Sequence, residues 1–586
     1  MRIKRLFDLL PYLIERHDKS VIFGGKKSGK WVSYSTRDYV KYSNLVSYGL
    51  MHLGIVKGDK VMTISNNRPE WNFVDMGCLQ TGAVHVPVYP TINDEDLLYV
   101  IKEVEPKFIF ASSKFLYQKV CLVLEQSGIN STVFVFDEMH GATHYQELIK
   151  KGEENPDEKS LEILKSAVGE NDIASIIYTS GTTSVPKGVM LTHENHISNF
   201  LAAAFTIRLK PEYVYLNYLP LSHSYERMVN YIVQYLGMSQ YYAESVSNIL
   251  ANMKDIKPHV LVTVPLLLEK VYEGIYKKGM SMTGIKRIIF KWAMNLAGRY
   301  RLNTEFSWWY RFQMDIAYKL VFIKWREAMG GNMIKIIAGG AKLQPHLLNI
   351  FWAARIPVFE GYGLTEAAPL VAYNTEDAVK PGSVGTVIAD VVVKIAPDGE
   401  VLVKGPNVMP GYYKHPEWTA EIIDKDGWLS TGDLGELDEK GFLTITGRKK
   451  DIFKIASGVY VFPERLEARL KQSFAVTHAL VSGENKNYLS AIIVPSLDYL
   501  QEYCKQNKLE PSTLEVMLKY KEVKTHLASE ISIINGPAVK EAETIQRYSY
   551  VPDEWTIENG DLTPSMKIKR RQLMVRYQKI FDSFYT

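Results

Sequence analysis

The feature that most constrains the fold is one hydroxyl-rich loop at residues 178–188. It reads Tyr-Thr-Ser-Gly-Thr-Thr-Ser-Val-Pro-Lys-Gly and joins two apolar runs. Residues 173–178 have the β-branched character of a buried strand, and residues 189–192 resume an extended pattern. Glycine lets the backbone approach an anion closely, successive amides form an anion-binding nest, and the hydroxyl groups with Lys187 add donors and charge. We therefore predict that the loop binds the phosphate chain of a nucleoside triphosphate.

Two other interpretations compete with phosphate binding. Segments rich in Ser, Thr and Gly between strands are usually surface turns, and this interpretation stays open. A Walker P-loop needs the pattern G-x-x-x-x-G-K-S/T at the start of a helix. In this chain the lysine precedes the second glycine and strand-like residues follow, so the spacing excludes a Walker loop.

The segment resembles the signature loop of the AMP-forming acyl- and aryl-CoA synthetases, the adenylate-forming enzymes. The resemblance implies that Lys187 and the residues before it hold the phosphates of ATP, and that Thr179 also belongs to a magnesium site. Ser184 stands where the family has glycine, and a left-handed backbone conformation is costly for serine. The other implied phosphate-binding residues are Thr179, Ser180, Gly181, Thr182 and Thr183.

The composition indicates a globular chain of several domains. Its 586 residues are 46% hydrophobic and 23% charged. No apolar run reaches the ~18 residues that a membrane-spanning helix needs. A net charge of +4 is too slight to indicate a nucleic-acid partner, and no Cys/His spacing is typical of a zinc site.

The first residues and the cysteines bear on the compartment. Residues 1–10 are basic and then apolar, but Asp8 and Pro11 interrupt the apolar run, and no small-residue cleavage site follows. A folded amphipathic helix is therefore expected in place of a signal peptide. The cysteines are odd in number and far apart, which indicates reduced thiols and a cytoplasmic location. They are Cys78, Cys121 and Cys504.

Strand and helix signals alternate through residues 31–150, which predicts βαβ units and a mostly parallel sheet covered on both faces. Residues 384–403 carry further strand signals and predict a small β-rich subdomain. The predicted fold class is α/β, with doubly wound, mostly parallel sheets. With the family resemblance, we divide the chain into an adenylation domain at 1–447 and a smaller, mobile α+β domain at 448–586.

Two predicted strands end in glycine-rich segments, at residues 339–341 and 361–363. Open α/β sheets bind ligands where parallel strands end, so both segments are expected at one ligand-binding edge. The resemblance assigns these segments to adenine and the acyl pocket, with Tyr362 stacked on adenine, Thr365 at the α-phosphate and Glu366 at magnesium. The remaining implied ATP-binding residues here are Gly339, Gly340, Ala341, Glu360, Gly361 and Gly363.

His223 lies between an apolar strand end and a predicted helix start. A lone histidine is more often a packed or surface residue. The string at 218–227 resembles a second core motif of the family, in which this side chain lies beside the acyl group and gates its access. We expect His223 to act as a wall and not as a general base, because a carboxylate is already ionised near pH 7.

The C-terminal motifs supply the remaining implied roles. By resemblance, Asp433 accepts the ribose hydroxyl groups beside Arg448, and Lys450 is the hinge. Residues 453–461, with Ser457 and Gly458, reach the pantetheine of CoA, and the loop at 562–571 carries the adenylation lysine, Lys567. Without the motifs, Asp433 would be a turn residue and the basic run at 567–571 a solvated surface.

Residues 286–326 contain nine Lys or Arg residues against two acidic residues, interleaved with aromatic side chains. Phe312, Ile316, Leu320 and Ile323 recur at helical spacing. Basic amphipathic helices with interfacial tryptophans lie on anionic membranes. We weigh a membrane-surface helix against a helix docked on the protein core, and both remain open.

Together, the motifs imply that ATP, a fatty acid and CoA yield acyl-CoA, AMP and diphosphate through an acyl-adenylate, with Mg²⁺ as cofactor. The long-chain assignment depends on the strings at 67–71 and 219–227 and on the aromatic segment. The alternatives are a medium-chain or aryl acid–CoA ligase, an acyl-AMP ligase that loads a carrier protein, and a silent lipid- or nucleotide-binding protein. The sequence does not predict the oligomeric state.

Overall fold

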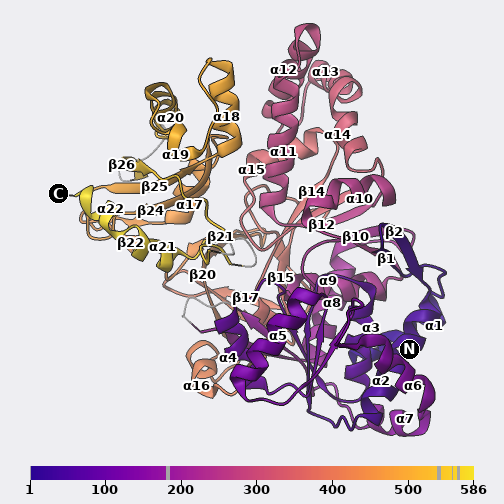
Figure 1. The fold of residues 1–586 in the computed structure, drawn as a ribbon. Coiled ribbons are helices and arrows are strands. Elements are labelled where there is room, and N and C mark those ends of the chain that lie inside the picture. Colours follow the sequence, from indigo (N-terminus) through magenta and orange to yellow (C-terminus); the bar gives the residue numbers. More distant parts are fainter. Residues whose placement is uncertain (1, 180–184, 537–542, 557–558, 564–567, 586) are drawn as a thin grey trace. The chain divides into compact units, whose positions relative to one another are not determined.

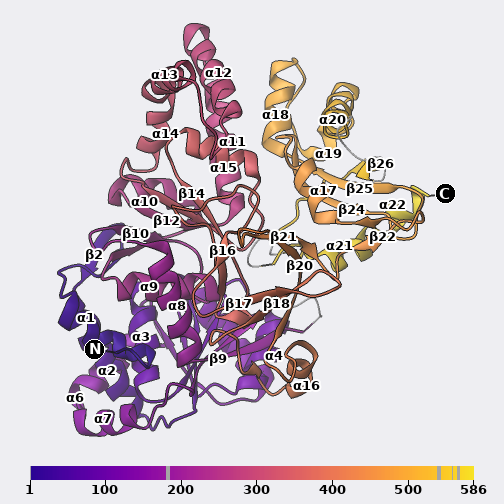
Figure 2. The ribbon, with the colours of Figure 1, turned by 180° about the vertical axis from the view of Figure 1, so that it is seen from behind.

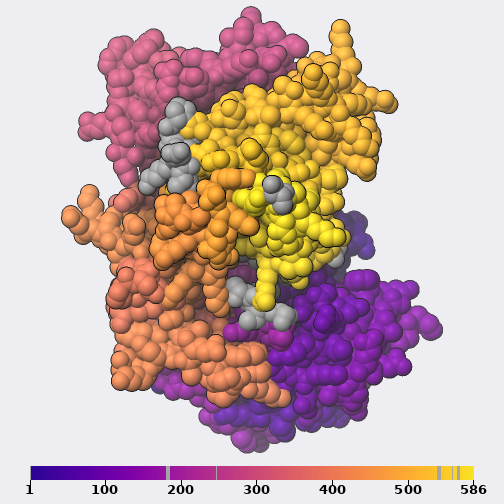
Figure 3. Space-filling view, turned by 90° about the vertical axis from the view of Figure 1, so that its left-hand side faces the viewer, coloured from indigo at the N-terminus to yellow at the C-terminus, as the bar shows by residue number. Residues whose placement is uncertain are grey.

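The computed structural model describes residues 2–179, 185–536, 543–556, 559–563 and 568–585, and the remaining residues are grey in Figures 1, 2 and 3. The chain forms two compact units. The N-terminal unit comprises Met1–Lys394, Leu402–Thr431 and Leu437–Thr444, and the C-terminal unit comprises Ile395–Val401, Gly432–Glu436 and Ile445–Thr586. The domain boundary between residues 447 and 448 stays a prediction.

An eight-stranded sheet forms one layer of the N-terminal unit, in the order β19-β9-β8-β4-β3-β5-β6-β7. The strands from β8 to β7 are parallel, and β9 and β19 add antiparallel pairs. The bounds are β3 Lys60–Ile64, β4 Val84–Val88, β5 Phe108–Ala111, β6 Thr132–Val135, β7 Thr143–His144, β8 Ile173–Thr179, β9 Lys187–Thr192 and β19 Gly411–Tyr412.

Helices cover both faces of this sheet (Figure 1). Met62 and Ile64 point into a core shared with α4 (Asp94–Val104) and α5 (Lys114–Ser127). Val61 on the same strand points to the opposite face, into a core shared with α2 (Thr36–His52) and α3 (Pro69–Gln80). Adjacent residues of a strand face opposite sides, so the near-continuous apolar runs of β3 and β5 fit a sheet buried on both faces.

A nine-stranded sheet follows the order β16-β15-β14-β13-β12-β10-β11-β1-β2. Its centre is parallel from β14 to β1, and β2, β15 and β16 pair antiparallel at the two edges. The predicted doubly wound, mostly parallel α/β fold is therefore confirmed. The bounds are β1 Phe23–Lys27, β2 Lys30–Tyr34, β10 Val214–Asn217, β11 Ser239–Tyr242, β12 Val260–Thr263, β13 Lys335–Ala338, β14 Val358–Gly363, β15 Leu370–Tyr373 and β16 Thr386–Val387.

A buried polar cluster joins α3 to α9 (Ser224–Tyr235), and we call it the α3–α9 contact. Asp75 accepts hydrogen bonds from Arg227 Nη2 at 2.6 Å and from the Tyr231 hydroxyl at 2.7 Å. His85 Nδ1 lies 2.7 Å from the same carboxylate. These side chains are fully buried, and such burial is tolerated because each charge has a partner. The helix α3 connects β3 to β4 of the eight-stranded sheet, and α9 connects β10 to β11 of the nine-stranded sheet. The contact between the two helices therefore ties the two sheets together.

A helical arm, residues 284–328, projects from the nine-stranded sheet (Figures 1 and 2). It consists of α12, α13, the π-helical turn η3 and α14. Their bounds are Gly284–Arg299, Trp308–Ala317, Tyr318–Phe322 and Ile323–Ala328. The helix α11 (Pro265–Met280) leads into the arm.

The C-terminal unit contains a three-stranded sheet, β24-β25-β26, with one antiparallel and one parallel pair. The bounds are β24 Val476–Ser482, β25 Leu489–Pro495, β26 Ile545–Tyr550, α17 Pro463–Leu470, α18 Leu497–Gln506, α20 Lys521–Ile534 and α21 Arg570–Arg576.

A separate four-stranded sheet has the order β17-β18-β20-β21, with β17 Val392–Ile395, β18 Glu400–Lys404, β20 Leu429–Leu437 and β21 Leu443–Arg448. None of the helices in the described part of the chain has the length and hydropathy to cross a membrane.

Candidate active site

The two ends of the hydroxyl-rich loop are held in one antiparallel ladder. Thr179, the last residue of β8, pairs in register with Lys187, the first residue of β9. The predicted strands on both sides of the loop are thus present. Ser180, Gly181, Thr182, Thr183 and Ser184 lie outside the described residues, so their phosphate contacts stay predictions.

Lys187 lies beside two aromatic rings that the sequence analysis did not single out. Its ammonium is 4.9 Å from the ring centroids of both Tyr412 and Trp418, within the range of cation–π attraction. The Tyr412 hydroxyl donates to Glu366 Oε1 at 2.9 Å. Tyr412 therefore contacts both groups: its ring lies beside Lys187, the predicted phosphate ligand, and its hydroxyl binds Glu366, the predicted magnesium ligand.

The first turn of α9 is the point at which three predicted segments meet. Ser224 Oγ lies 2.9 Å from Thr365 Oγ1, and the Tyr225 hydroxyl donates to the Ile337 carbonyl at 3.3 Å. His223 caps the helix, since its Nδ1 accepts from the Tyr225 amide at 3.1 Å. Its ring approaches Tyr89 edge to face with centroids 6.2 Å apart. The candidate acyl gate and the candidate α-phosphate contact thus share one helical turn.

The glycines of the two ligand loops are required by close approaches. A Cβ atom at Gly339 would lie 3.0 Å from the Tyr225 ring, and one at Gly363 would lie 1.9 Å from the Pro369 carbonyl oxygen. Gly340 adopts a φ of +78°, which favours glycine. The segment at 339–341 follows β13, as the sequence predicts, whereas residues 361–363 belong to β14 because they pair with β15. Ala341 continues the first of these segments, and Gly361 and the buried Tyr362 lie near the end of β14.

Glu360 is a buried acid within β14, directly before Gly361. Its Oε1 accepts from the Leu343 amide at 3.3 Å, and its Oε2 has no hydrogen-bond partner among the described residues. Burial raises the pKa of Glu360 to about 8. The carboxyl group is therefore protonated at neutral pH, and it can donate a hydrogen bond to a ligand at this loop.

Asp433 and Arg448 form an ion pair within the C-terminal unit, with Arg448 Nε 3.0 Å from Asp433 Oδ1. Asp433 is buried, and Gly432 beside it donates its amide to Glu400 Oε1 at 2.9 Å. Lys449 pairs with the same Glu400 at 2.8 Å. The structure therefore brings the two predicted ribose residues together, and the predicted hinge, Lys450, follows directly.

Ser457 and Gly458 lie in the exposed turn between β22 (Phe453–Lys454) and β23 (Tyr460–Val461), which pair antiparallel. Gly458 has a φ of +83° and donates its amide to the Ile455 carbonyl at 2.8 Å. An exposed hairpin turn is accessible to a large ligand. Lys567, the predicted adenylation lysine, lies outside the described residues.

Within the described ranges, no group of three or more His, Cys, Asp or Glu side chains is arranged to hold a metal ion. Glu366 offers one carboxylate, and Thr179 offers a hydroxyl at the strand end. Mg²⁺ is bound by one or two carboxylates together with phosphate oxygens and water, so this sparse donor set fits a magnesium–nucleotide complex.

Comparisons with known proteins agree with this geometry. A family model described as AMP-binding enzyme matches residues 14–413. The chain is 31% identical to fatty acyl-CoA synthetase A of Dictyostelium discoideum, over 97% of this chain and 88% of that protein. It is 32% identical to long-chain-fatty-acid–CoA ligase 5 of Mus musculus, over 95% and 84% of the two chains.

The fold also resembles solved structures. The anthranilate CoA ligase AuaEII in complex with anthranoyl-AMP superposes with a TM-score of 0.75 at 16% identity, over 98% of this chain and 97% of that chain. The adenylation domain of a carboxylate reductase from Mycobacterium chelonae gives 0.76 at 21% identity, over 99% and 91%. At these identities the similarity concerns the fold.

Proposed function

Because the chain belongs to the AMP-binding enzyme family, we propose that it is a long-chain fatty acid–CoA ligase, which converts ATP, a fatty acid and CoA into acyl-CoA, AMP and diphosphate. The observation that carries the proposal is the meeting of His223, Thr365 and the Gly339 segment on the first turn of α9. The names of the relatives supply the acyl class, since curated relatives over nearly the whole chain are long-chain ligases.

In the first half-reaction, the fatty acid carboxylate attacks the α-phosphorus of ATP, which forms acyl-AMP and releases diphosphate. The transition state gathers negative charge, so preorganised cations and amide donors lower its energy. Lys187 supplies one cation, and its aromatic neighbours Tyr412 and Trp418 limit its conformations. Thr365 contacts the α-phosphate, and Lys567 supplies a second cation. When bound, Mg²⁺ adds Lewis-acid stabilisation of the phosphate oxygens beside Glu366 and Thr179.

In the second half-reaction, the CoA thiol attacks the acyl carbonyl, so that a C–S bond forms and the bond to AMP breaks. The C-terminal domain pivots at Lys450, withdraws Lys567 and presents the turn at Ser457 and Gly458 to pantetheine. Asp433 and Arg448 retain the ribose of AMP. His223 forms the wall of the acyl site throughout, and it needs no titration because the substrate acid is already ionised.

A substrate panel tests the proposal. Acyl-CoA formation would be measured with palmitate, octanoate and benzoate, with and without CoA. We expect palmitate to give the highest kcat/KM. A preference for octanoate or benzoate would indicate the medium-chain or aryl alternative, and adenylate without thioester would indicate a carrier-loading ligase. Failure to consume ATP with any acid would leave only a silent binding protein and overturn the proposal.

We further propose a cytoplasmic protein whose helical arm binds an anionic membrane surface. Large apolar side chains of α12 and α13 are exposed, with Trp308 76% and Ile285 75% exposed. The core side of the arm is instead formed by Ala317, Phe322 and Trp325. The other exposed apolar residues are Ile288, Trp309, Phe312 and Leu320.

Exposed cations surround this apolar surface, and none of them has an acidic partner among the described ion pairs. Asp315, one of the three acidic residues in the arm, is paired with Arg355 outside the arm. A surface with tryptophans and unneutralised cations is complementary to anionic headgroups. The cations are Lys286, Arg287, Lys291, Arg311, Lys319 and Lys324.

Flotation with vesicles tests the arm. The protein should float with phosphatidylcholine vesicles that contain phosphatidylserine, and less with pure phosphatidylcholine. Trp308→Ala with Trp309→Ala should reduce flotation. Phe205→Ala removes a similarly exposed aromatic ring outside the arm, at 74% exposure, and should leave flotation unchanged. Equal flotation of the tryptophan variant and the wild type would exclude the arm as the membrane contact.

A further inference from the structure

We propose that Asn67 is a positioning residue that fixes the acyl-gating His223 and thereby sets the chain-length preference; this inference rests on the proposed function. Asn67 follows β3 in the loop before α3, and both polar atoms of its side-chain amide make hydrogen bonds to the segment at 217–221. Its Nδ2 donates to the Leu219 carbonyl at 2.5 Å and to Asn217 Oδ1, and its Oδ1 accepts from the Leu221 amide at 3.1 Å.

The turn that Asn67 holds leads directly into His223. Asn67 binds the backbone on both sides of Pro220, which has no amide hydrogen of its own to anchor the turn. The His223 amide then donates to the Pro220 carbonyl at 2.9 Å, and the His223 side chain caps α9. His223 lies only two residues after Leu221. A displacement of the backbone from Leu219 to Leu221 therefore displaces His223 as well.

A second set of hydrogen bonds fixes the same turn from its other side. Asn217, the last residue of β10, donates from Nδ2 to Glu226 Oε1 at 2.5 Å, and the Tyr215 hydroxyl donates to the same oxygen at 2.7 Å. Glu226 lies in the first turn of α9 and is fully buried. The strand before the turn and the helix after it are thus joined, and Asn67 links the pair to the eight-stranded sheet.

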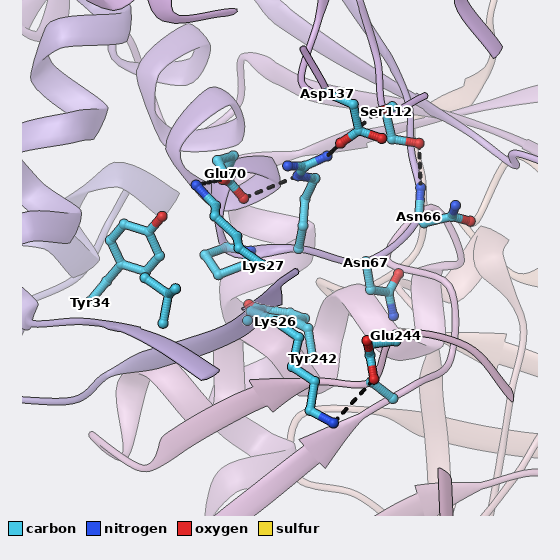
Figure 4. Close-up of a pocket in the computed structure, with 15 residues that line it drawn as sticks. Lys26, Lys27, Tyr34, Asn66, Asn67, Glu70, Ser112, Asp137, Tyr242 and Glu244 are labelled. Carbon is cyan, nitrogen blue, oxygen red and sulfur yellow. Dashed lines mark hydrogen bonds and ion pairs between the residues drawn. The ribbon is translucent and has the colours of Figure 1, made fainter. Parts of the chain in front are cut away.

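The loop that carries Asn67 is itself anchored. Figure 4 shows Asn66 and Asn67 along one side of a polar cavity of about 210 Å³, across from Tyr34. Next to Asn67, Arg68 pairs with Glu70 at 3.1 Å and with Asp137 at 2.9 Å. These ion pairs fix the backbone next to Asn67. The side-chain amide of Asn67 therefore holds the turn at 219–221 at a defined position relative to the cavity wall.

Loss of the Asn67 hydrogen bonds should weaken selection among acids more than it weakens nucleotide binding. Without Asn67, the Leu219 carbonyl and the Leu221 amide lose their partner, and the turn can shift with His223. The wall beside a long acyl chain then becomes poorly defined. Glu366 is held by Tyr412 and not by this turn, whereas Thr365 contacts Ser224 next to His223, so the KM for ATP should change less than the preference among acids.

The test compares Asn67→Ala and Asn67→Asp with Asn66→Ala, whose exposed side chain lines the same cavity and makes no recorded hydrogen bond in the described structure. The palmitate-to-octanoate ratio of kcat/KM should fall about tenfold in Asn67→Ala, as expected for lost hydrogen bonds. In Asn67→Asp the same ratio should fall at least as far, because a carboxylate cannot donate a hydrogen bond to the Leu219 carbonyl. Asn66→Ala should retain the ratio within about twofold.

A double-mutant cycle separates positioning from general damage. If Asn67 acts through His223, then Asn67→Ala with His223→Ala should have the same ratio as His223→Ala alone. Additive losses, or an unchanged ratio in the near-isosteric Asn67→Asp, would overturn the inference. Palmitate turnover by the wild type checks the proposed function separately, so the two failures are distinguishable.

Discussion

The α3–α9 contact and the helical arm use the same residue types in opposite ways. In the contact, Arg227 lies 5.5 Å from the Trp71 ring and pairs with Asp75 in full burial. In the arm, Trp308 and Arg311 are exposed, and no acid neutralises the arginine among the described ion pairs. The comparison teaches that tryptophan and arginine stabilise the fold only where partners within the chain satisfy them. Where such partners are lacking, as in the arm, the same side chains are the basis for proposing an external partner.

The largest expected effect is at Asp75. Asp75→Asn leaves Arg227 buried without a counter-charge and should lower the free energy of unfolding by about 3–5 kcal/mol, measured by urea unfolding. Asp315→Asn is the matched control in the arm, because its pair with Arg355 is about half exposed. That variant should cost less than about 1 kcal/mol. Similar losses for both variants would contradict the distinction between the two regions.

The pH dependence of stability should sharpen the comparison inside the buried region. Burial alone would raise the pKa of Asp75, but Arg227, His85 and Tyr231 lower it to about 2. Its contribution to stability is therefore present above the ordinary aspartate pKa, and it is lost as the pH falls from about 4 to about 2.

At Glu360 burial outweighs the attraction of Lys342, so this acid should behave in the opposite sense. Its folded pKa of about 8 lies above the unfolded value, so the folded state binds the extra proton and stability falls as pH rises toward 8. Between pH 5.5 and 8.5 the wild type should lose about 2–3 kcal/mol relative to Glu360→Gln, compared by urea midpoints. Parallel pH profiles of the two proteins would show that Glu360 is ionised when folded.

The smallest effect on stability is expected at the exposed end of the arm. Trp308→Ala with Trp309→Ala should change the free energy of unfolding by less than about 0.5 kcal/mol per site, because both rings are mostly in solvent. Trp325→Ala, in the core side of the same arm, should cost about 3–5 kcal/mol. A large loss from the exposed pair would mean that these rings stabilise the fold, which would weaken the membrane proposal.

Local sequence signals predicted the strands on both sides of the hydroxyl-rich loop and the glycines after β13, but the glycines at 361 and 363 extend β14 and do not form a loop after it. The strand predicted at 334–338 spans Lys335–Ala338 and stops before Gly339, where the Tyr225 ring occupies the space of a side chain. Long-range partners could not be predicted in this way. Tyr412 reaches Lys187 only because β19 pairs with β9, and Asn67 reaches Leu219 across 152 residues. Contacts between residues so far apart leave no periodic pattern in the local sequence from which they could be predicted.

The arm shows a different limit of sequence reasoning. The apolar stripe of the sequence runs through Phe312, Ile316, Leu320 and Ile323. Phe312 and Leu320 are about half exposed, whereas Val321 and Phe322, which lie outside the stripe, are buried. The π-helical turn at Tyr318–Phe322 inserts an extra residue and rotates the face that follows it. A regular 3.6-residue period cannot predict such a change of phase.

The central claim is that acid activation proceeds through acyl-AMP, with Lys567 required for that step alone. The most direct measurement is palmitate-dependent exchange of labelled diphosphate into ATP without CoA, set beside thioester formation from supplied palmitoyl-AMP and CoA. The account predicts that Lys567→Ala lowers exchange by roughly 100-fold and leaves thioester formation intact. Exchange that does not depend on palmitate in the wild type, or equal loss of both half-reactions in Lys567→Ala, would contradict it.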